Sequence, residues 1–105
     1  MYTICETTVF TKYYSDYWSE EEYSDFQMFL ASNPNAGVVE PNTGGIRKIR
    51  WRSGKTGKRS GVRVIYFNRL ANGEIWLLTI YEKSTTAKLS KKTLKALAEK
   101  LNESF

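Results

Sequence analysis

Three runs with strand character in the second half of the chain constrain its fold more than any other feature. Residues 46–52, 61–67 and 75–81 are rich in β-branched and aromatic side chains, and polar loops that contain glycine separate them. Such short connections favour antiparallel neighbours, because parallel strands need a crossover of a dozen or more residues. The third run is apolar on both faces, which is typical of a central strand. The sequence therefore predicts an antiparallel meander.

The region before the meander predicts one strand and two helices. Residues 2–6 have strand character, and a helix follows them through Tyr17. Ser19 and Glu22 have the spacing of a capping box, in which each side chain accepts from the other's backbone amide. A second helix therefore begins there, and the Asn-Pro pair at 33–34 ends it.

The order of these elements indicates an α+β fold. A last helix is predicted from a Ser90 cap to about Asn102, so the chain has the order β-α-α-β-β-β-α. We expect one domain over residues 1–105, built on an antiparallel sheet of about four strands. The two N-terminal helices would cover one face, and the C-terminal helix would lie at the edge or on the opposite side.

Charge is divided unevenly along the chain. Residues 1–45 hold one base and seven acids, a net charge of −6, whereas residues 46–105 hold fifteen bases and four acids, a net charge of +11. Residues 46–69 alone contain nine bases and no acid. Cations at this density repel one another unless an anion is near, and a phosphate backbone is the commonest large anion. The pattern favours contact with nucleic acid over a basic hairpin that is merely solvated.

Composition removes several other classes of protein. The single cysteine, Cys5, cannot form an internal disulfide, and without histidine it leaves no usual zinc site. The N-terminus lacks the pattern of a signal peptide, and the longest nearly apolar run, residues 75–80, is too short to span a bilayer. We therefore expect a cytoplasmic protein with no membrane partner.

Strand alternation gathers cations on one face of the predicted sheet. Lys48, Arg50 and Arg52 share one face of the first meander strand. Arg63, on the next strand, can approach Lys48 or Arg50, because facing residues lie about 5 Å apart. An arginine in so apolar a strand is costly to bury without an anion. That anion is either a bound phosphate or a carboxylate of Glu82 or Glu74, unless the guanidinium reaches solvent.

The end of the last strand is a further candidate region. Tyr81 and Lys83 alternate with Glu82, so they point the same way where the sheet ends. Ends of strands often carry functional side chains. The alternative is that Tyr81 is a core residue and Lys83 a surface cation.

Several segments together resemble a known family. GGIRKIRW (44–51), GVRVIYF (61–67) and IWLLTIYEKS (75–84), followed by a Leu-rich basic helix, are similar to the HigB-like toxins of the RelE superfamily. EEYSDF (21–26) and the Asn-Pro pair at 33–34 also agree, so the resemblance covers most of the chain in order and spacing. It implies a RelE-like fold and an endoribonuclease that cuts mRNA in the ribosomal A site without a cofactor. It also implies two partners: the 70S ribosome with its mRNA, and a cognate antitoxin, often a helix-turn-helix protein.

The resemblance also implies catalytic residues. Two basic residues before the basic turn correspond to Lys48 and Arg50, the arginine of the catalytic groove to Arg63, and the basic residue after the last strand to Lys83. Tyr81 joins them as a candidate by its position. Where RelE members carry a tyrosine near the C-terminus this chain has Leu89, and it lacks the histidines of other HigB toxins, so the general base is open.

Roles for these residues follow from the chemistry of RNA cleavage by the ribose 2′-OH. Arginines match phosphate oxygens, which suits Arg50 and Arg63 to the charged transition state. Lys48 lies among cations, which should lower its pKa and let it act as a base, while a charged Lys83 could act as the acid. Alternatively the ribosome orients the RNA and the protein supplies mainly charge.

The remaining basic residues are candidates for gripping RNA through its phosphates, without reading sequence. They are Arg47 and Arg52 beside the first meander strand, Lys55, Lys58 and Arg59 in the turn, and Lys91, Lys92 and Lys95 on the last helix.

Three other classes of function use the same surface. A non-catalytic ribosome- or RNA-binding module would use Trp51, Tyr66 or Tyr81 as stacking platforms. A protein-interaction module would bind an acidic partner through the basic face. DNA binding is disfavoured, because the sequence has no helix-turn-helix signal and the basic residues lie on strands and loops.

Overall fold

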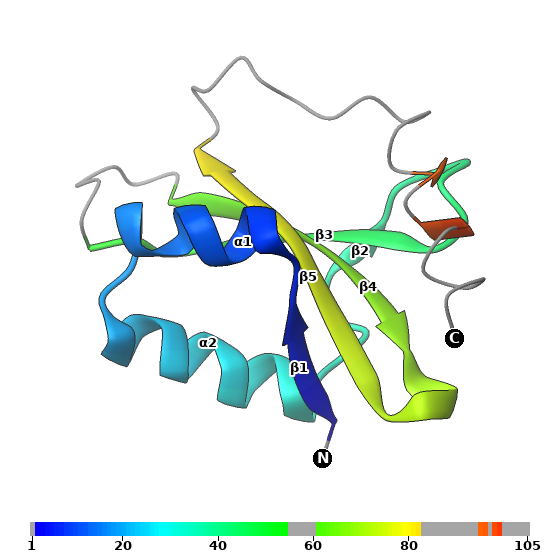
Figure 1. Cartoon of the computed structure of the whole chain (residues 1–105), viewed down its shortest axis with the longest axis horizontal. Coiled ribbons are helices and arrows are strands. Elements are labelled where there is room, and N and C mark those ends of the chain that lie inside the picture. The colour runs from blue at the N-terminus through cyan, green and yellow to red at the C-terminus, as the bar shows by residue number, and fades with distance from the viewer. Residues whose placement is uncertain (1, 55–60, 83–94, 97, 100–105) are drawn as a thin grey trace.

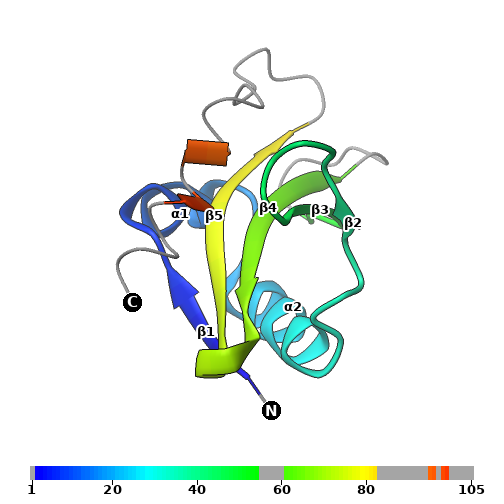
Figure 2. The same cartoon turned by 90° about the vertical axis from the view of Figure 1, so that its right-hand side faces the viewer.

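Strands from both halves of the chain join in one mixed sheet. The computed structural model describes residues 2–54, 61–82, 95, 96, 98 and 99. Within these residues the sheet has five strands in the order β1-β5-β4-β3-β2, seen from one edge to the other in Figure 2. Their bounds are β1 (Thr3–Glu6), β2 (Val38–Val39), β3 (Ile46–Trp51), β4 (Val62–Arg69) and β5 (Glu74–Glu82).

The antiparallel meander is confirmed for β3, β4 and β5, but the predicted antiparallel sheet of about four strands is a mixed sheet of five among the described residues. Strand β1 pairs with β5 in parallel. Strand β2 lies in the segment that was expected to be a loop, and it pairs with β3. Two residues are too few to show a periodic pattern, so β2 left no signal in the sequence. The direction of β1 depends on how the intervening helices return the chain, which alternation does not encode.

Two N-terminal helices form as predicted. Helix α1 (Thr8–Tyr13) begins at Thr7, whose hydroxyl accepts from the amide of Phe10 at 3.1 Å, and a short 3₁₀ turn continues it through Asp16. Helix α2 (Glu20–Ser32) has the expected capping box: Ser19 Oγ accepts from the amide of Glu22, and Glu22 Oε1 accepts from the amide of Ser19.

Both helices pack on one face of the sheet, as Figure 1 shows. The larger core lies between them and the sheet and contains Phe10, Trp18, Tyr23, Phe26, Leu30, Val62, Val64, Tyr66, Ile75, Leu77 and Ile80. Phe29 of α2 is 37% exposed, and its ring contacts that of Trp51. Trp51 ends β3 beyond the two residues that pair with β2, so Phe29 lies at the margin of the sheet.

A second, smaller core lies on the opposite face of the sheet. Its buried members are Ile46, Ile65, Phe67, Leu78 and Ala98. Residues 95, 96, 98 and 99 are helical, and Ala98 is 1% exposed, so this part of the C-terminal segment packs against the sheet. The rest of the predicted helix over 90–102 lies outside the described residues.

A polar network joins β1 to both helices. Glu6 accepts from Tyr23 Oη, and its other oxygen accepts from Thr11 Oγ1 at 2.6 Å. Burial, reinforced by the hydrogen bond to Glu6, raises the pKa of the Tyr23 phenol far above its ordinary value. The phenol therefore stays protonated and acts as a donor.

We expect Tyr23→Phe to lower the free energy of unfolding by about 1.5–3 kcal/mol at pH 7, because a carboxylate loses a donor. A raised folded-state pKa adds stability that is complete below about pH 10 and lost as pH rises through the folded value. The difference between wild type and variant should therefore shrink above about pH 10. Urea denaturation at several pH values measures it. Tyr14→Phe is the matched control, since its bond to Glu20 is exposed; an equal loss in both variants would contradict this account.

Candidate active site

A row of three side chains crosses the sheet on the face opposite the two N-terminal helices. Arg50 on β3 pairs with Arg63 on β4, and Arg63 pairs with Tyr81 on β5. Directly paired residues on one face have Cβ atoms about 4.5–5.5 Å apart. The expected approach of Arg63 to Arg50 is therefore confirmed, and Tyr81 lies on the other side of Arg63. Two guanidinium groups so close together favour an anion between or above them.

An irregularity in β5 places Tyr81 in this row. Ile65 pairs with Thr79 and the next residue, Tyr66, pairs with Leu77, so Leu78 is an extra residue on β5. Such a bulge shifts the alternation of faces by one position. Without the shift, Tyr81 would point to the helix side, away from Trp76 and Leu78. With it, Tyr81 packs against the same small core as these two residues.

The chain junction between β1 and α1 holds this bulge. The Thr7 hydroxyl donates to the carbonyl of Leu78 at 2.8 Å, and the Thr7 amide donates to the carbonyl of Leu77 at 3.1 Å. The extra residue's carbonyl thus has a partner outside the ladder, which satisfies the polar group that a bulge leaves open. The helix cap and the position of Tyr81 therefore depend on the same threonine.

Lys48 lies one row further along β3 and is paired with an acid. Its Nζ is 3.0 Å from Oε1 of Glu40. Lys48 was expected to lie among cations and so to act as a base, but its neighbours include this carboxylate. Glu40 lies in the segment expected to be a loop, and β2 brings it to the edge of the sheet because Val38 pairs with Lys48. No pattern near Lys48 in the sequence could have revealed this contact.

Arg47 lies on the helix side of the sheet, apart from the row. Its Nη1 donates to the carbonyl of Gly37 at 2.7 Å and to that of Asn35 at 3.3 Å. Next to it, Tyr66 Oη accepts from the Gly37 amide at 2.8 Å and donates to the Pro34 carbonyl at 2.9 Å. Burial raises the pKa of Tyr66. The two side chains hold the loop after α2 against β3 and β4.

Arg50 and Arg52 flank Trp51 at the open edge of the sheet. An open pocket of about 250 Å³ lies there, and its described lining residues are these three. The Arg52 guanidinium lies over the indole of Trp51, 5.9 Å from its centroid. Sequence alternation placed Arg50 and Arg52 together, but the pocket itself was not predicted.

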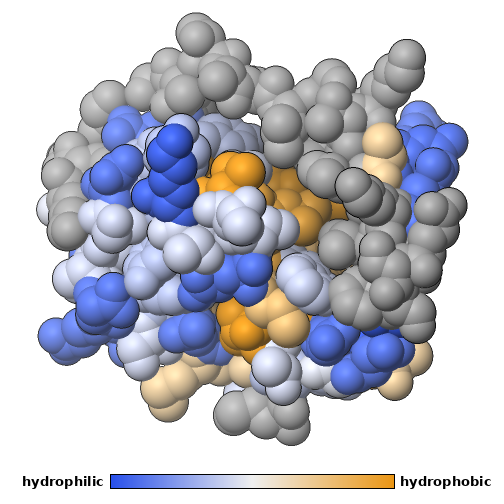
Figure 3. Space-filling model, viewed as in Figure 1, coloured by the Kyte–Doolittle hydropathy of each residue, from blue (hydrophilic) through white to orange (hydrophobic). Residues whose placement is uncertain are grey.

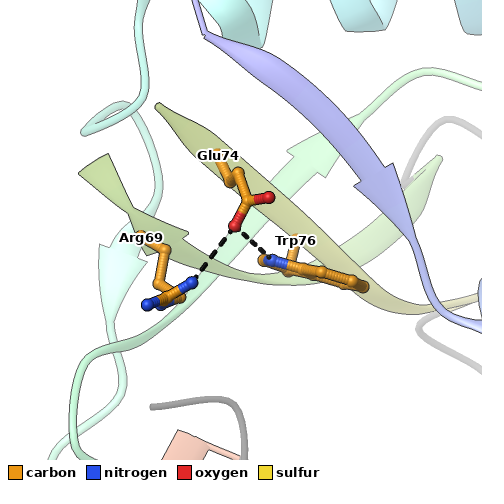
Figure 4. Close-up of polar contacts among 3 residues, drawn as sticks. All are labelled: Arg69, Glu74 and Trp76. Carbon is orange, nitrogen blue, oxygen red and sulfur yellow. Dashed lines mark hydrogen bonds and ion pairs between the residues drawn. The ribbon is translucent and has the colours of Figure 1, made fainter. Parts of the chain in front are cut away.

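Glu74 is not the partner of Arg63. Its Oε1 accepts from Arg69 Nη1 at 3.3 Å and from Trp76 Nε1 at 3.4 Å, as Figure 4 shows. Glu74 pairs in register with Arg69, whereas Arg63 pairs with Tyr81 at the opposite end of β5. The sequence alternative that assigned Glu74 to Arg63 is therefore wrong.

Other predicted residues fall elsewhere. Lys95 is exposed on the helical segment beside Ala98. The remaining candidates lie outside the described residues: Lys55, Lys58, Arg59, Lys83, Lys91 and Lys92. Among the described residues, no group of three His, Cys, Asp or Glu side chains could hold a metal ion.

None of the helices in the described ranges is long and apolar enough to cross a membrane. On the side drawn in Figure 3, the apolar surface is a narrow central strip with hydrophilic residues around it.

The fold is similar to that of the E. coli RelE toxin, so the prediction of a RelE-like α+β fold is confirmed at that level. A chain of the intact E. coli RelBE toxin–antitoxin complex matches with a TM-score of 0.62 and 15% identity, over 81% of this chain and 100% of that chain. The isolated E. coli RelE toxin matches with a TM-score of 0.59 and 13% identity, over 100% of both chains. No family model matches the sequence. At such identities the likeness shows the fold alone.

Proposed function

We propose that this protein is the toxin of a toxin–antitoxin pair, of the HigB type, and that it cleaves mRNA in the ribosomal A site. The observation that carries the proposal is the cross-strand row of Arg50, Arg63 and Tyr81. It lies on the sheet face opposite α1 and α2 in a fold similar to that of the E. coli RelE toxin. A row of guanidinium groups beside a phenol suits an RNA phosphate better than it suits a stable core.

The reaction we propose is attack by a ribose 2′-oxygen on the adjacent phosphorus. A bond forms between these atoms, the bond from phosphorus to the 5′-oxygen breaks, and a cyclic phosphate and a 5′-hydroxyl result. Arg50 and Arg63 stabilise the negative charge that builds on the phosphate oxygens. Lys83 is our candidate for protonating the departing 5′-oxygen.

Lys48 and Tyr81 are the two side chains of the site that could accept the 2′-OH proton. The third candidate is the ribosome itself. Lys48 is ion-paired with Glu40, so its pairing supports a role as a cation near the phosphate. Tyr81 lies beside Arg63 in the row. If the ribosome orients the 2′-OH for attack, proximity supplies much of the rate and a tuned base is unnecessary.

Ribosomal RNA would be held by basic residues other than those of the row. Arg52, Lys55, Lys58, Arg59, Lys91, Lys92 and Lys95 are our candidates, and they would contact phosphates without reading sequence. Arg47 would act less directly, because its guanidinium already donates to backbone carbonyls. The second partner is a cognate antitoxin, of the helix-turn-helix type, and the site of action is the cytoplasm.

Expression of the chain alone in a bacterium tests the proposal. Translation and growth should stop, and mRNA should be cut within coding regions, because charged residues placed for cleavage act on every translating ribosome. Sequencing of mRNA 5′-ends after induction locates the cuts. Co-expression of the neighbouring gene, if it encodes the antitoxin, should restore growth. Normal growth with verified folded protein would overturn the proposal.

A non-catalytic ribosome-binding module is the second candidate. The pairing of Lys48 with Glu40 favours it, because the ammonium group of Lys48 already has a carboxylate partner. Single-turnover incubation of programmed ribosomes with the protein separates the two. Binding with intact mRNA supports the module, and cut mRNA supports the nuclease.

A further inference from the structure

The open pocket beside the row of Arg50, Arg63 and Tyr81 has no role in the proposed cleavage reaction. It lies where β3 runs past its neighbour, because β2 pairs only with Arg47 and Lys48. Arg50, Trp51 and Arg52 line its described part, and its volume is about 250 Å³. Pockets for drug-sized ligands usually measure about 300–1,000 Å³, so this one suits a single planar ring system.

The backbone below the pocket is fixed to the helical layer. The Arg52 carbonyl accepts from Trp18 Nε1 at 2.8 Å, and the Gly54 amide donates to Glu22 Oε2 at 2.7 Å. Between them, Ser53 Oγ donates to the carbonyl of Tyr17. Three successive residues are thus held by the segment that joins α1 to α2 and by the first turn of α2. A site built on a fixed backbone loses little freedom when a ligand binds.

The side chain of Trp51 is also held in place, by two aromatic rings of α2. Its ring meets Phe26 at 5.3 Å between centroids in an edge-to-face arrangement, and Phe29 at 5.0 Å. The Arg52 guanidinium lies 5.9 Å from its centroid. An indole fixed on one side by two rings is a stacking platform for another flat ring, and the cations beside it suit a negatively charged group attached to that ring.

We propose that this pocket binds one unpaired nucleobase of single-stranded RNA against Trp51, with the adjoining phosphate held by Arg50 and Arg52. The inference rests on the proposed function and adds a base-binding subsite to it. Arg50 belongs both to the pocket and to the row with Arg63, so a nucleotide held here is contiguous with a phosphate held there. An acidic peptide would satisfy the guanidinium groups but would leave the indole unused.

The probe for this subsite is a trinucleotide of RNA with 2′-O-methyl sugars, which block the attacking oxygen and so prevent cleavage. It is added to the full chain while indole N–H signals are followed by NMR, with Trp51→Phe used for assignment. The Trp51 signal should shift and saturate. The same trinucleotide with an abasic central position should bind about tenfold more weakly, because stacking on an aromatic side chain contributes about that factor per base.

Trp76→Phe is the matched control. Trp76 is also half-buried, but it lies with Glu74 at the far end of β5, so its replacement should leave trinucleotide affinity unchanged. Trp51→Leu, which removes the ring and keeps an apolar contact for Phe26 and Phe29, should weaken the normal trinucleotide to the level of the abasic one. Trp51→Phe should retain most of the affinity, since a ring remains.

Three outcomes would overturn the subsite. They are equal affinity for the normal and abasic probes, a shift of the Trp76 signal without Trp51, and saturation of the Trp51 signal by a hexaglutamate peptide in preference to RNA. If any of these occurs while the wild type cuts mRNA on ribosomes, the subsite fails and the proposed function stands. If the wild type also leaves mRNA intact, the nuclease proposal fails with it.

Discussion

Arg63→Ala should lower single-turnover cleavage of ribosome-bound mRNA by about 10²–10³, which corresponds to about 3–4 kcal/mol of transition-state stabilisation. Arg63 stands between Arg50 and Tyr81 in the cross-strand row, so its loss removes the central cation. Ribosome binding draws on many other cations of the C-terminal part and should fall only slightly. Cosedimentation, thermal melting and single-turnover cleavage together measure these three properties.

Arg69→Ala is the matched control for this experiment. It lies on the same strand as Arg63 and is also half-buried, but its partner is Glu74. It should cleave mRNA at the parental rate. Arg63→Lys, which keeps the charge without the planar fork, should fall between the wild type and the alanine variant. Parental cleavage by Arg63→Ala would show that Arg63 is not catalytic. Early melting of Arg63→Ala, with Arg63→Lys stable and active, would make it a structural residue.

Gly61→Ala should destabilise the protein by about 2–5 kcal/mol, the largest effect expected of any single methyl group here. Gly61 has φ of 63°, and a Cβ at this position would lie 2.1 Å from the Trp51 carbonyl oxygen. The left-handed conformation costs a non-glycine residue about 1–2 kcal/mol, and overpacking adds about 1–3 kcal/mol. The backbone must move to admit the methyl group, and with it the start of β4 that sets Arg63 opposite Arg50.

Gly73→Ala separates the two contributions. Gly73 has φ of 72°, but a Cβ there would meet no atom within 4 Å. Its cost should therefore be limited to the conformational part, about 1–2 kcal/mol. Urea denaturation of both variants gives the comparison. Equal destabilisation would mean that the backbone at Gly61 shifts at little energetic cost to admit the methyl group. The contact with Trp51 would then not hold the register of β3 and β4.

The sequence by itself determined the local elements and the face of the central row. The Ser19 and Glu22 capping box forms as the spacing requires, because its hydrogen bonds join residues three apart. Alternation also brought Arg50 and Arg63 to one face, and the antiparallel pairing of β3 with β4 set them opposite each other. Both results follow from contacts that are local or that join strands consecutive in the chain.

Only the tertiary structure decided the rest of the site. Tyr81 reaches the row through an extra residue in β5 whose carbonyl is held by Thr7, and Lys48 meets Glu40 because β2 joins the sheet. Arg47, a candidate RNA contact in the sequence, instead donates hydrogen bonds to the loop carbonyls of Asn35 and Gly37. Each of these depends on a partner distant in the chain or on a one-residue shift in register. Periodicity records which face a residue takes in a regular strand, and carries no information about bulges or about which distant segment supplies the partner.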